Sequence, residues 1–143
     1  MASIPLHYVD LRTFCYVTED EKRVEEALAT FLPEEFDIQR TESEGHHGDR
    51  IVVLTARIEN ADEIRTALDS LADLPDEAFE HVVDQLDERV NDNCAFFLTL
   101  DKQAAFNGEI RRGDGITVRA KVEAYPARKE AAVENIEGLL EEL

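Results

Sequence analysis

Two hydrophobic periodicities alternate along the chain. Apolar residues recur at every second position, or run continuously, in five segments that predict strands at residues 6–17, 36–44, 50–59, 93–101 and 116–124. Between and after these segments, apolar residues at helical spacing predict helices at about residues 19–32, 60–71, 75–90 and 132–143. A turn or two of helix is also predicted just after residue 101. The predicted order is therefore β-α-β-β-α-α-β-α-β-α.

This order predicts an α+β fold with two layers, in which helices pack on a largely antiparallel, five-stranded sheet. Because 143 residues is the length of one domain, we expect a single unit over residues 1–143. Residues 93–101 form the most apolar strand, which we expect at the centre of the sheet. The apolar run at residues 51–54 is typical of a strand that is covered on both faces. If all helices pack on one side, the other side is open and presents Arg119 and Lys121.

The first strand has two different faces. Its odd positions form an apolar core face, made of Val9, Leu11, Cys15 and Val17. Its even positions mix aromatic rings with a guanidinium and are Tyr8, Asp10, Arg12, Phe14 and Tyr16. Such a mixture suits a surface on which nucleic-acid bases stack. The alternative is that these rings lie beneath a helix, and the frequent burial of large aromatic residues favours this second interpretation.

Local signals mark where several elements begin and end. Thr18 and Glu21 have the spacing of a capping box at the start of the first helix, and Asn60 and Glu63 have the same spacing before the second. His81 lies off the apolar stripe of its predicted helix and is expected at the surface. The glycine-containing segment at residues 45–49 predicts a hairpin loop between two strands.

The composition is strongly acidic, with 33 acids against 15 bases and a formal charge of −18. The acids lie on every predicted helix, so the charge is a property of the whole surface. Such a surface suits a salt-rich cytoplasm, in which screening removes the self-repulsion. We therefore expect the stability to rise with added salt. No apolar run approaches the length of a membrane span and no signal-peptide pattern is present, which predicts a soluble, cytoplasmic protein.

The sign of the charge is locally reversed at residues 101–129. This window holds four acids and carries a net charge of +3, because its seven bases are Lys102, Arg111, Arg112, Arg119, Lys121, Arg128 and Lys129. The 100 residues before it carry −16, and those after it carry −5. The reversal predicts one cationic surface for an anionic partner, most plausibly nucleic acid. The alternative is that these bases only neutralise neighbouring carboxylates.

No motif supports catalysis, a cofactor or a metal. Cys15 and Cys94 lie in apolar strands, where thiols are usually inert, buried and unpaired by a disulfide. The adjacent His46 and His47, with Asp49, lack the ligand spacing of a structural zinc site, so we expect an exposed polar turn. The sequence therefore predicts a protein that is not an enzyme and that binds no cofactor or metal.

The segments DLRTFCY, TEDEKRV, LTLDKQAAFNGEI and GDGITVRAKVEAYP resemble an archaeal family of small RNA-binding proteins, whose members are also labelled as predicted exosome-associated subunits. Haloarchaeal members are the most similar. The resemblance covers nearly the whole chain and depends mainly on the block at residues 101–105, with Gly108 shortly after it. It implies a two-layer α+β fold like that of a large-subunit ribosomal protein that binds rRNA. It also implies RNA binding in the cytoplasm near the RNA-degrading machinery, and it marks Lys102, Gln103 and Gly108 as motif positions.

The leading hypothesis is a non-catalytic RNA-binding protein. The residues expected to contact RNA are Lys102, Gln103, Arg111, Arg112, Arg119, Lys121, Arg128 and Lys129, with stacking from Tyr8, Arg12, Phe14 and Tyr16. One alternative is an adaptor that binds a subunit of an RNA-processing complex and does not touch RNA. Another is a hydrolase that the sequence does not reveal.

Overall fold

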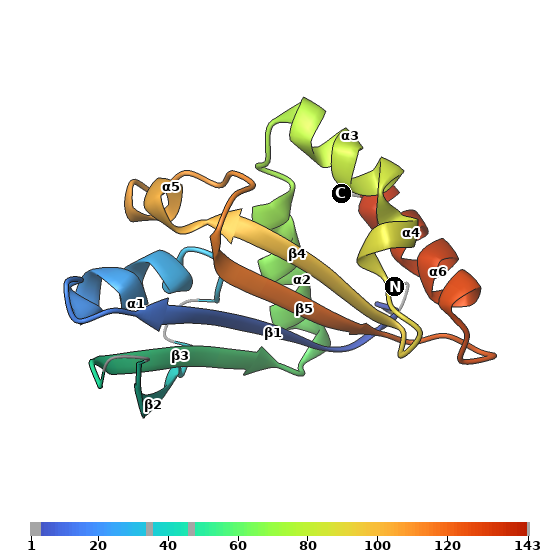
Figure 1. Cartoon of the computed structure of the whole chain (residues 1–143). Coiled ribbons are helices and arrows are strands. Elements are labelled where there is room, and N and C mark those ends of the chain that lie inside the picture. Colours follow the sequence, from blue (N-terminus) through green and yellow to red (C-terminus); the bar gives the residue numbers. More distant parts are fainter. Residues whose placement is uncertain (1–3, 34–35, 46–47, 143) are drawn as a thin grey trace.

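The computed structural model describes residues 4–33, 36–45 and 48–142, and Figure 1 shows how the elements are arranged. The strands are β1 (Leu6–Cys15), β2 (Gln39–Glu44), β3 (Arg50–Ile58), β4 (Ala95–Asp101) and β5 (Gly115–Val122). The helices are α1 (Glu21–Ala29), α2 (Ala61–Leu71), α3 (Asp76–Asp84), α4 (Leu86–Arg89), α5 (Lys102–Phe106) and α6 (Lys129–Glu141). The predicted α+β class and order of elements are confirmed, except that the helix predicted at residues 75–90 is divided into α3 and α4.

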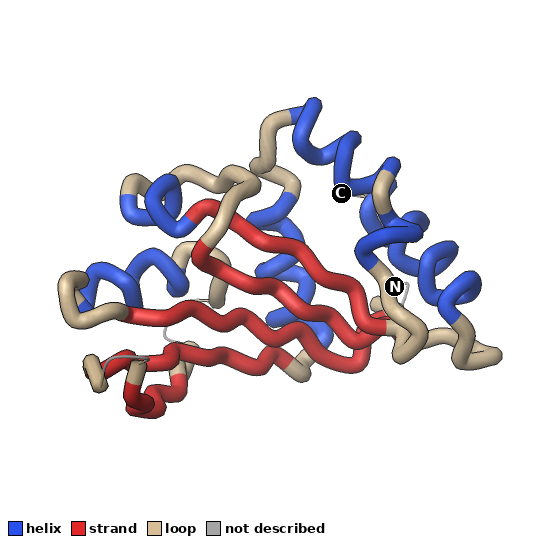
Figure 2. Tube along the Cα trace, in the orientation of Figure 1, coloured by secondary structure: helices blue, strands red, loops and turns tan. Residues whose placement is uncertain are grey.

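The five strands form one sheet in the order β2-β3-β1-β5-β4, and every neighbouring pair is antiparallel. Figure 2 shows the five strands as one layer. The prediction that residues 93–101 form the central strand is wrong, because β4 lies at an edge. Isolated bridges from Val90 to Phe96 and from Arg112 to Leu100 occupy the outer side of β4. This cover explains why an edge strand can be so apolar.

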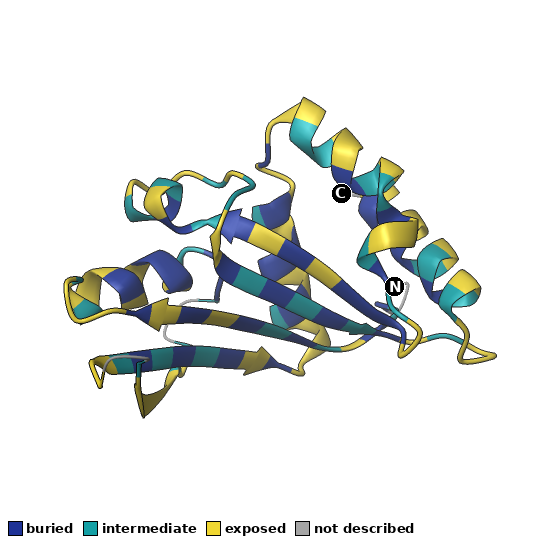
Figure 3. Cartoon of the chain, viewed as in Figure 1, coloured by how far each residue is buried: buried dark blue, intermediate teal, exposed yellow. Residues whose placement is uncertain are grey.

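The core lies on one face of the sheet. Alternate residues of four strands, such as Val9, Leu54, Leu98 and Val118, are buried in one cluster with the apolar sides of the helices. Figure 3 shows the resulting alternation of buried and more exposed positions along the strands. The expectation that residues 51–54 are covered on both faces is wrong, because Val52 and Leu54 are buried whereas Ile51 and Val53 are only half-buried.

Local capping decides where the helices begin. The side chain of Asn60 accepts hydrogen bonds from the backbone N–H groups of Asp62 and Glu63, as predicted. The cap of α1 differs from the prediction, because the side chain of Asp20, and not that of Thr18, accepts from the N–H of Lys22. The helical run beginning at residue 76 is interrupted at Gln85, and the chain is extended by Val90, which pairs with Phe96.

The two cysteines are buried and free, as the sequence predicts. Burial, and then the charge of Glu19, raises the pKa of the Cys15 thiol above its ordinary value. Over the described residues, we find no helix that combines the length and the apolarity required to cross a bilayer.

Candidate nucleic-acid interface

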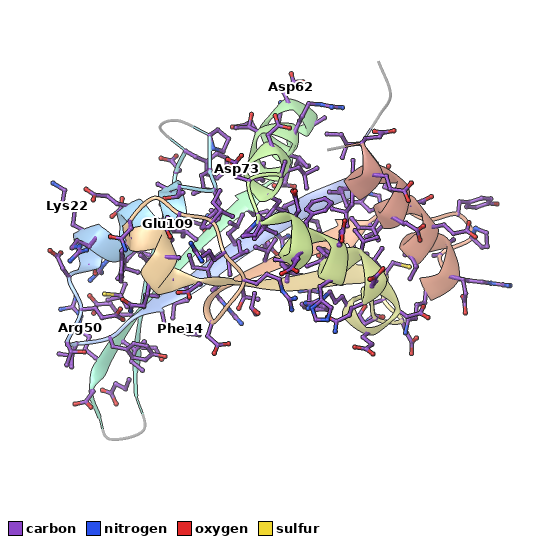
Figure 4. The ribbon with its side chains drawn as sticks, turned by 90° about the horizontal axis from the view of Figure 1, so that it is seen from above. Phe14, Lys22, Arg50, Asp62, Asp73 and Glu109 are labelled. Atoms are coloured by element: carbon purple, nitrogen blue, oxygen red, sulfur yellow. The ribbon has the colours of Figure 1, made fainter. Side chains whose placement is uncertain are left out.

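None of the described helices covers the face of the sheet opposite the core, and we call this face the open face. Directly opposed residues of paired strands point to the same side of a sheet, so the strand registers identify its members. Figure 4 shows Phe14 on the side of the sheet away from α2, which carries Asp62. The residues of the open face on β1, β3, β4 and β5 include Tyr8, Asp10, Arg12, Phe14, Val53, Thr55, Arg57, Phe97, Thr99, Asp101, Thr117, Arg119 and Lys121.

The aromatic face of the first strand is therefore surface, and its predicted burial under a helix is wrong. Phe14 and Phe97 are each 37% exposed, whereas the core phenylalanines Phe31 and Phe96 are 2% exposed. Tyr16, at the end of the same strand face, is 50% exposed. The physical reason is that the described helices pack their apolar residues into the core on the other face, so none of these helices covers the rings.

Each ring of the open face has a guanidinium close to it. The distance from the guanidinium carbon to the ring centroid is 4.0 Å for Arg57 and Tyr8, 5.5 Å for Arg12 and Phe14, and 5.8 Å for Arg119 and Phe97. These distances lie within the range of cation–π attraction. Bases of unpaired nucleic acid stack on both aromatic rings and guanidinium planes, so these pairs offer flat contact surfaces.

Arg57 is the most firmly held of these groups. Its Nε and Nη2 donate to the two carboxylate oxygens of Asp10 at 2.8 and 2.9 Å, which is a bidentate pair. The hydrogen bond to Asp10 raises the pKa of Arg57 above its ordinary value. Arg57 therefore covers one side of the Tyr8 ring, and a base on this side would stack on the guanidinium plane.

The other cations of the open face are not neutralised by acids. The set contains four bases, Arg12, Arg57, Arg119 and Lys121, against two acids, Asp10 and Asp101. Among the described residues, only Arg57 of these four makes a salt bridge. Lys121 donates to the backbone carbonyl of Asn93, and Arg119 has a buried Nε without a partner. The open face is thus locally positive in a strongly acidic protein.

A groove of about 950 Å³ crosses the open face. On the β1, β4 and β5 part of the sheet it is lined by Asp10, Arg12, Thr117, Arg119 and Phe97, and on β3 by Thr55 and Arg57. Beyond Thr55, the last residue of β3 that pairs with β2, the groove reaches an acidic end. This end is lined by Asp37, Glu59 and Glu63. Phosphates are therefore expected over the β1 and β5 part of the groove and disfavoured at the acidic end.

Lys102, the motif lysine, is not on this surface. Its side chain is 8% exposed, and its Nζ donates to the carbonyl of Phe14 at 2.6 Å and to Glu19 Oε1 at 2.7 Å. The neighbouring Asp101 accepts from the N–H groups of Gln103 and Ala104 and so caps α5. The block at residues 101–105 is thus explained by local structure, and Gln103 lies exposed on α5.

The seven bases of the window at residues 101–129 do not form one surface, so the prediction of a single cationic surface is wrong. Arg111 pairs with Glu109 at 3.0 Å, and Arg112 lies 2.8 Å from His81, both before β5. Arg128 and Lys129 lie beyond the other end of β5, at the start of α6 (Figure 1). A β-strand separates these groups because it extends about 3.3 Å per residue.

Two residues of the ring–guanidinium pairs, Phe97 and Arg57, were missed by sequence reasoning. Phe97 was hidden in the apolar run of β4, where a buried ring and an exposed ring are adjacent in sequence. Arg57 follows a run of apolar residues, and its alternation with the buried Ala56 and Ile58 is a signal that could have identified it.

His46 and His47 lie outside the described residues. In the described part, no three His, Cys, Asp or Glu side chains are grouped to hold a metal ion.

Fold and site together define a two-layer α+β protein with an open antiparallel sheet face that carries rings and guanidiniums. The chain belongs to the family described as RNA binding, whose model matches residues 8–122. It is 36% identical over 144 residues to RNA-binding protein PAB1135 of Pyrococcus abyssi, covering 94% of each chain. It is 30% identical over 142 residues to the uncharacterized protein MJ0213 of Methanocaldococcus jannaschii, covering 92% of this chain and 95% of that protein.

Solved structures show the same fold. Protein AF2318 from Archaeoglobus fulgidus superposes with a TM-score of 0.84 at 28% identity, covering 94% of this chain and 99% of that chain. Mth689 from Methanothermobacter thermautotrophicus, a DUF54 protein, superposes with a TM-score of 0.78 at 39% identity, covering 94% and 98%.

Proposed function

We propose that this protein binds unpaired RNA on the open face of its sheet, without catalysing a reaction. Bases stack on Phe14 and Phe97, and Arg12, Arg119 and Lys121 contact phosphates. The observation that carries the proposal is the excess of bases and exposed rings on one uncovered face of a protein of charge −18. The family description and the name of the relative from Pyrococcus abyssi support it.

The energetics favour unpaired RNA. Three phosphate contacts to a single strand give a salt slope of about −2, so a tenfold rise in salt weakens binding by roughly 100-fold. Each stacked base contributes about 1–3 kcal/mol and is insensitive to charge screening. In salty surroundings the stacking contribution therefore dominates, and only unpaired bases expose their faces to the rings.

Substitution on the open face tests the proposal. We expect Phe97→Ala to weaken binding of a single-stranded oligonucleotide by roughly tenfold or more, because one stacked base is lost. Arg119→Gln is expected to weaken binding and to make the salt slope shallower by about 0.7. Fluorescence anisotropy at several KCl concentrations measures both effects, with a duplex of the same sequence as the competing ligand.

Arg65→Gln is the matched control, because it removes the same charge from an exposed position of α2, on the other side of the sheet. This variant is expected to bind like the wild type. If the wild type binds no RNA, or if the open-face variants and the control bind equally, the assignment of RNA to this face fails. Equal binding of duplex and single strand would contradict the stacking of unpaired bases.

Three finer proposals rest on the sequence resemblance and composition. We propose a role near the RNA-degrading machinery, such as the exosome, in the cytoplasm of a salt-adapted archaeon. A purified archaeal exosome core tests this role, since addition of the protein should alter degradation of a bound oligonucleotide only when the open face is intact. Cleavage of RNA by the repurified protein alone, with Mg²⁺ or Mn²⁺, would contradict the non-catalytic proposal. Binding to the exosome core without any affinity for RNA would favour the adaptor alternative.

A further inference from the structure

Arg89 and Arg112 both lie at the outer edge of β4, the strand edge that does not pair with β5. Arg112 pairs with Leu100 in an isolated bridge on this edge. Val90, which follows Arg89 in the chain, pairs with Phe96 on the same edge. Figure 1 shows α3 and α4 along the side of β4 that faces away from β5.

Each of the two guanidiniums contacts one side chain of the α3 segment, His81 within α3 or Gln85 at its end. His81 Nδ1 lies 2.8 Å from Arg112 Nη1, and Gln85 Oε1 accepts from Arg89 Nη2 at 2.8 Å. The N–H of Gln85 donates to the carbonyl of His81, so the two partners are one helical turn apart. Side chains four residues apart on a helix are neighbours, with about 5–6 Å between their Cβ atoms. The two arginines are thus bound by side chains from adjacent turns of one helical segment, and the charge of Arg112 acts on Arg89.

Neither partner of these cations is an acid: Arg112 contacts the imidazole of His81, and Arg89 donates to the amide oxygen of Gln85. Within the described chain, neither Arg89 nor Arg112 makes a salt bridge, and Nε of Arg89 is buried without a partner.

The electrostatic cost of this arrangement is visible at Arg89. Burial, and then the charge of Arg112, lowers the pKa of Arg89 from its ordinary value, while Glu88 acts in the opposite direction. Two like charges that are partly removed from water are unfavourable unless an anion joins them.

We propose that Arg89 and Arg112 form a binding site for a phosphate group, which we call the edge site. Guanidiniums bind phosphate oxygens bidentately, and two of them match the charge of a phosphate monoester. The inference rests on the proposed function in one respect, because it takes RNA as the source of the phosphate. A strand that stacks on Phe97, in the edge strand β4, reaches the outer edge of the sheet next.

Inorganic phosphate tests the edge site without RNA. It is added to the wild-type protein in place of KCl at constant ionic strength, and the Nε–H signals of the arginines are followed by NMR. We expect the signals of Arg89 and Arg112 to shift with a saturable dependence on phosphate, and the signal of Arg65 to stay unchanged. Unmoved signals of Arg89 and Arg112 would overturn the edge site and leave the two side chains a purely structural role between α3 and β4.

Variants and RNA ends identify the source of the phosphate. We expect Arg112→Gln and Arg89→Gln each to weaken RNA binding by roughly tenfold, and Arg65→Gln to leave it unchanged. Oligonucleotides with phosphorylated and unphosphorylated ends are compared. Tighter binding of a phosphorylated end that disappears in Arg112→Gln assigns a terminal monoester, whereas equal losses for both oligonucleotides assign an internal phosphodiester. RNA affinity that is unchanged in both variants would overturn the role of the edge site in RNA binding.

The two proposals fail in different ways. If Phe97→Ala and Arg119→Gln weaken RNA binding but phosphate does not shift the NMR signals of Arg89 and Arg112, the open-face proposal is supported and the edge site is refuted. If phosphate shifts the two signals but the open-face variants bind RNA like the wild type, the edge site is supported and the proposed function of the open face is refuted.

Discussion

At the scale of single residues, the surroundings of a charge decide its role. Lys102 and Arg119 both lie in the cationic window, but Lys102 is buried against Glu19 whereas Arg119 lies beside an exposed ring. The buried ammonium connects α5 to the carbonyl of Phe14, at the end of β1. Lys102 is therefore part of the framework, and its side chain is not presented to a phosphate.

Replacement of Lys102 separates these two roles. We expect Lys102→Met to lower the free energy of unfolding by about 3 kcal/mol, because Glu19 and the Phe14 carbonyl lose their partner in a poorly solvated place. Urea denaturation measures this change, and the exposed Lys22→Met is the control, expected to change stability by at most about 0.5 kcal/mol. RNA affinity of the folded Lys102→Met protein should be unchanged. If the variant is as stable as the wild type but has lost RNA affinity, then Lys102 contacts RNA and is not part of the framework.

At the scale of elements, two glycines have opposite roles. Gly115 begins β5 with φ +117°, and a Cβ there would lie 2.5 Å from Cβ of Lys102. Its carbonyl also accepts from the hydroxyl of Thr13 at 2.7 Å, so the strand cannot easily shift. Gly138 lies within α6, and a Cβ at this position would meet no described atom within 4 Å. The first glycine allows close packing, whereas the second only weakens a helix.

We expect alanine substitutions at Gly115 and Gly138 to change the free energy of unfolding in opposite directions. Gly115→Ala should lower the free energy of unfolding by at least about 2 kcal/mol, because of the backbone conformation and the overlap with Lys102. Gly138→Ala should raise it by roughly 1 kcal/mol, the difference in helix propensity. Thermal and urea unfolding of both variants measure the changes. Equal effects at the two sites would contradict the described packing of β5 against α5.

At the scale of the whole molecule, the charge acts in opposite directions on folding and on binding. The net charge of −18 produces repulsion across the surface, and salt screens it. Screening also weakens the attraction between phosphates and the cations of the open face. Stacking on Phe14 and Phe97 is the contribution that salt leaves nearly unchanged.

We therefore expect the melting temperature to rise between low and molar KCl, while RNA affinity falls with a slope near −2 on a double-logarithmic scale. Calorimetry and anisotropy in the same buffers measure the two responses. A melting temperature that does not depend on salt would contradict self-repulsion as the main effect of the acidic surface. A slope much steeper than −2 would show that more cations contact the RNA than the open face supplies.

Local patterns were sufficient for much of the fold. The strand predicted at residues 116–124, which the structure places at 115–122, and the cap at Asn60 could be predicted, because alternation and capping depend on residues that are close in sequence. The antiparallel sheet and the candidate residues Tyr8, Arg12, Arg119 and Lys121 also followed from these patterns. Periodicity identifies the two faces of a strand, but it does not say which face a helix covers when both are partly apolar.

The order of the strands and the burial of particular side chains depend on contacts between distant segments, which local patterns do not show. The edge position of β4, the exposure of Phe14 and Phe97, and the burial of Lys102 against Glu19 each need the three-dimensional arrangement. The same holds for Arg112 and His81, which are separated in the chain and meet where the segment before β5 pairs with the outer edge of β4. A count of charges along the chain cannot detect such meetings, because the order of strands in the sheet differs from their order in the sequence.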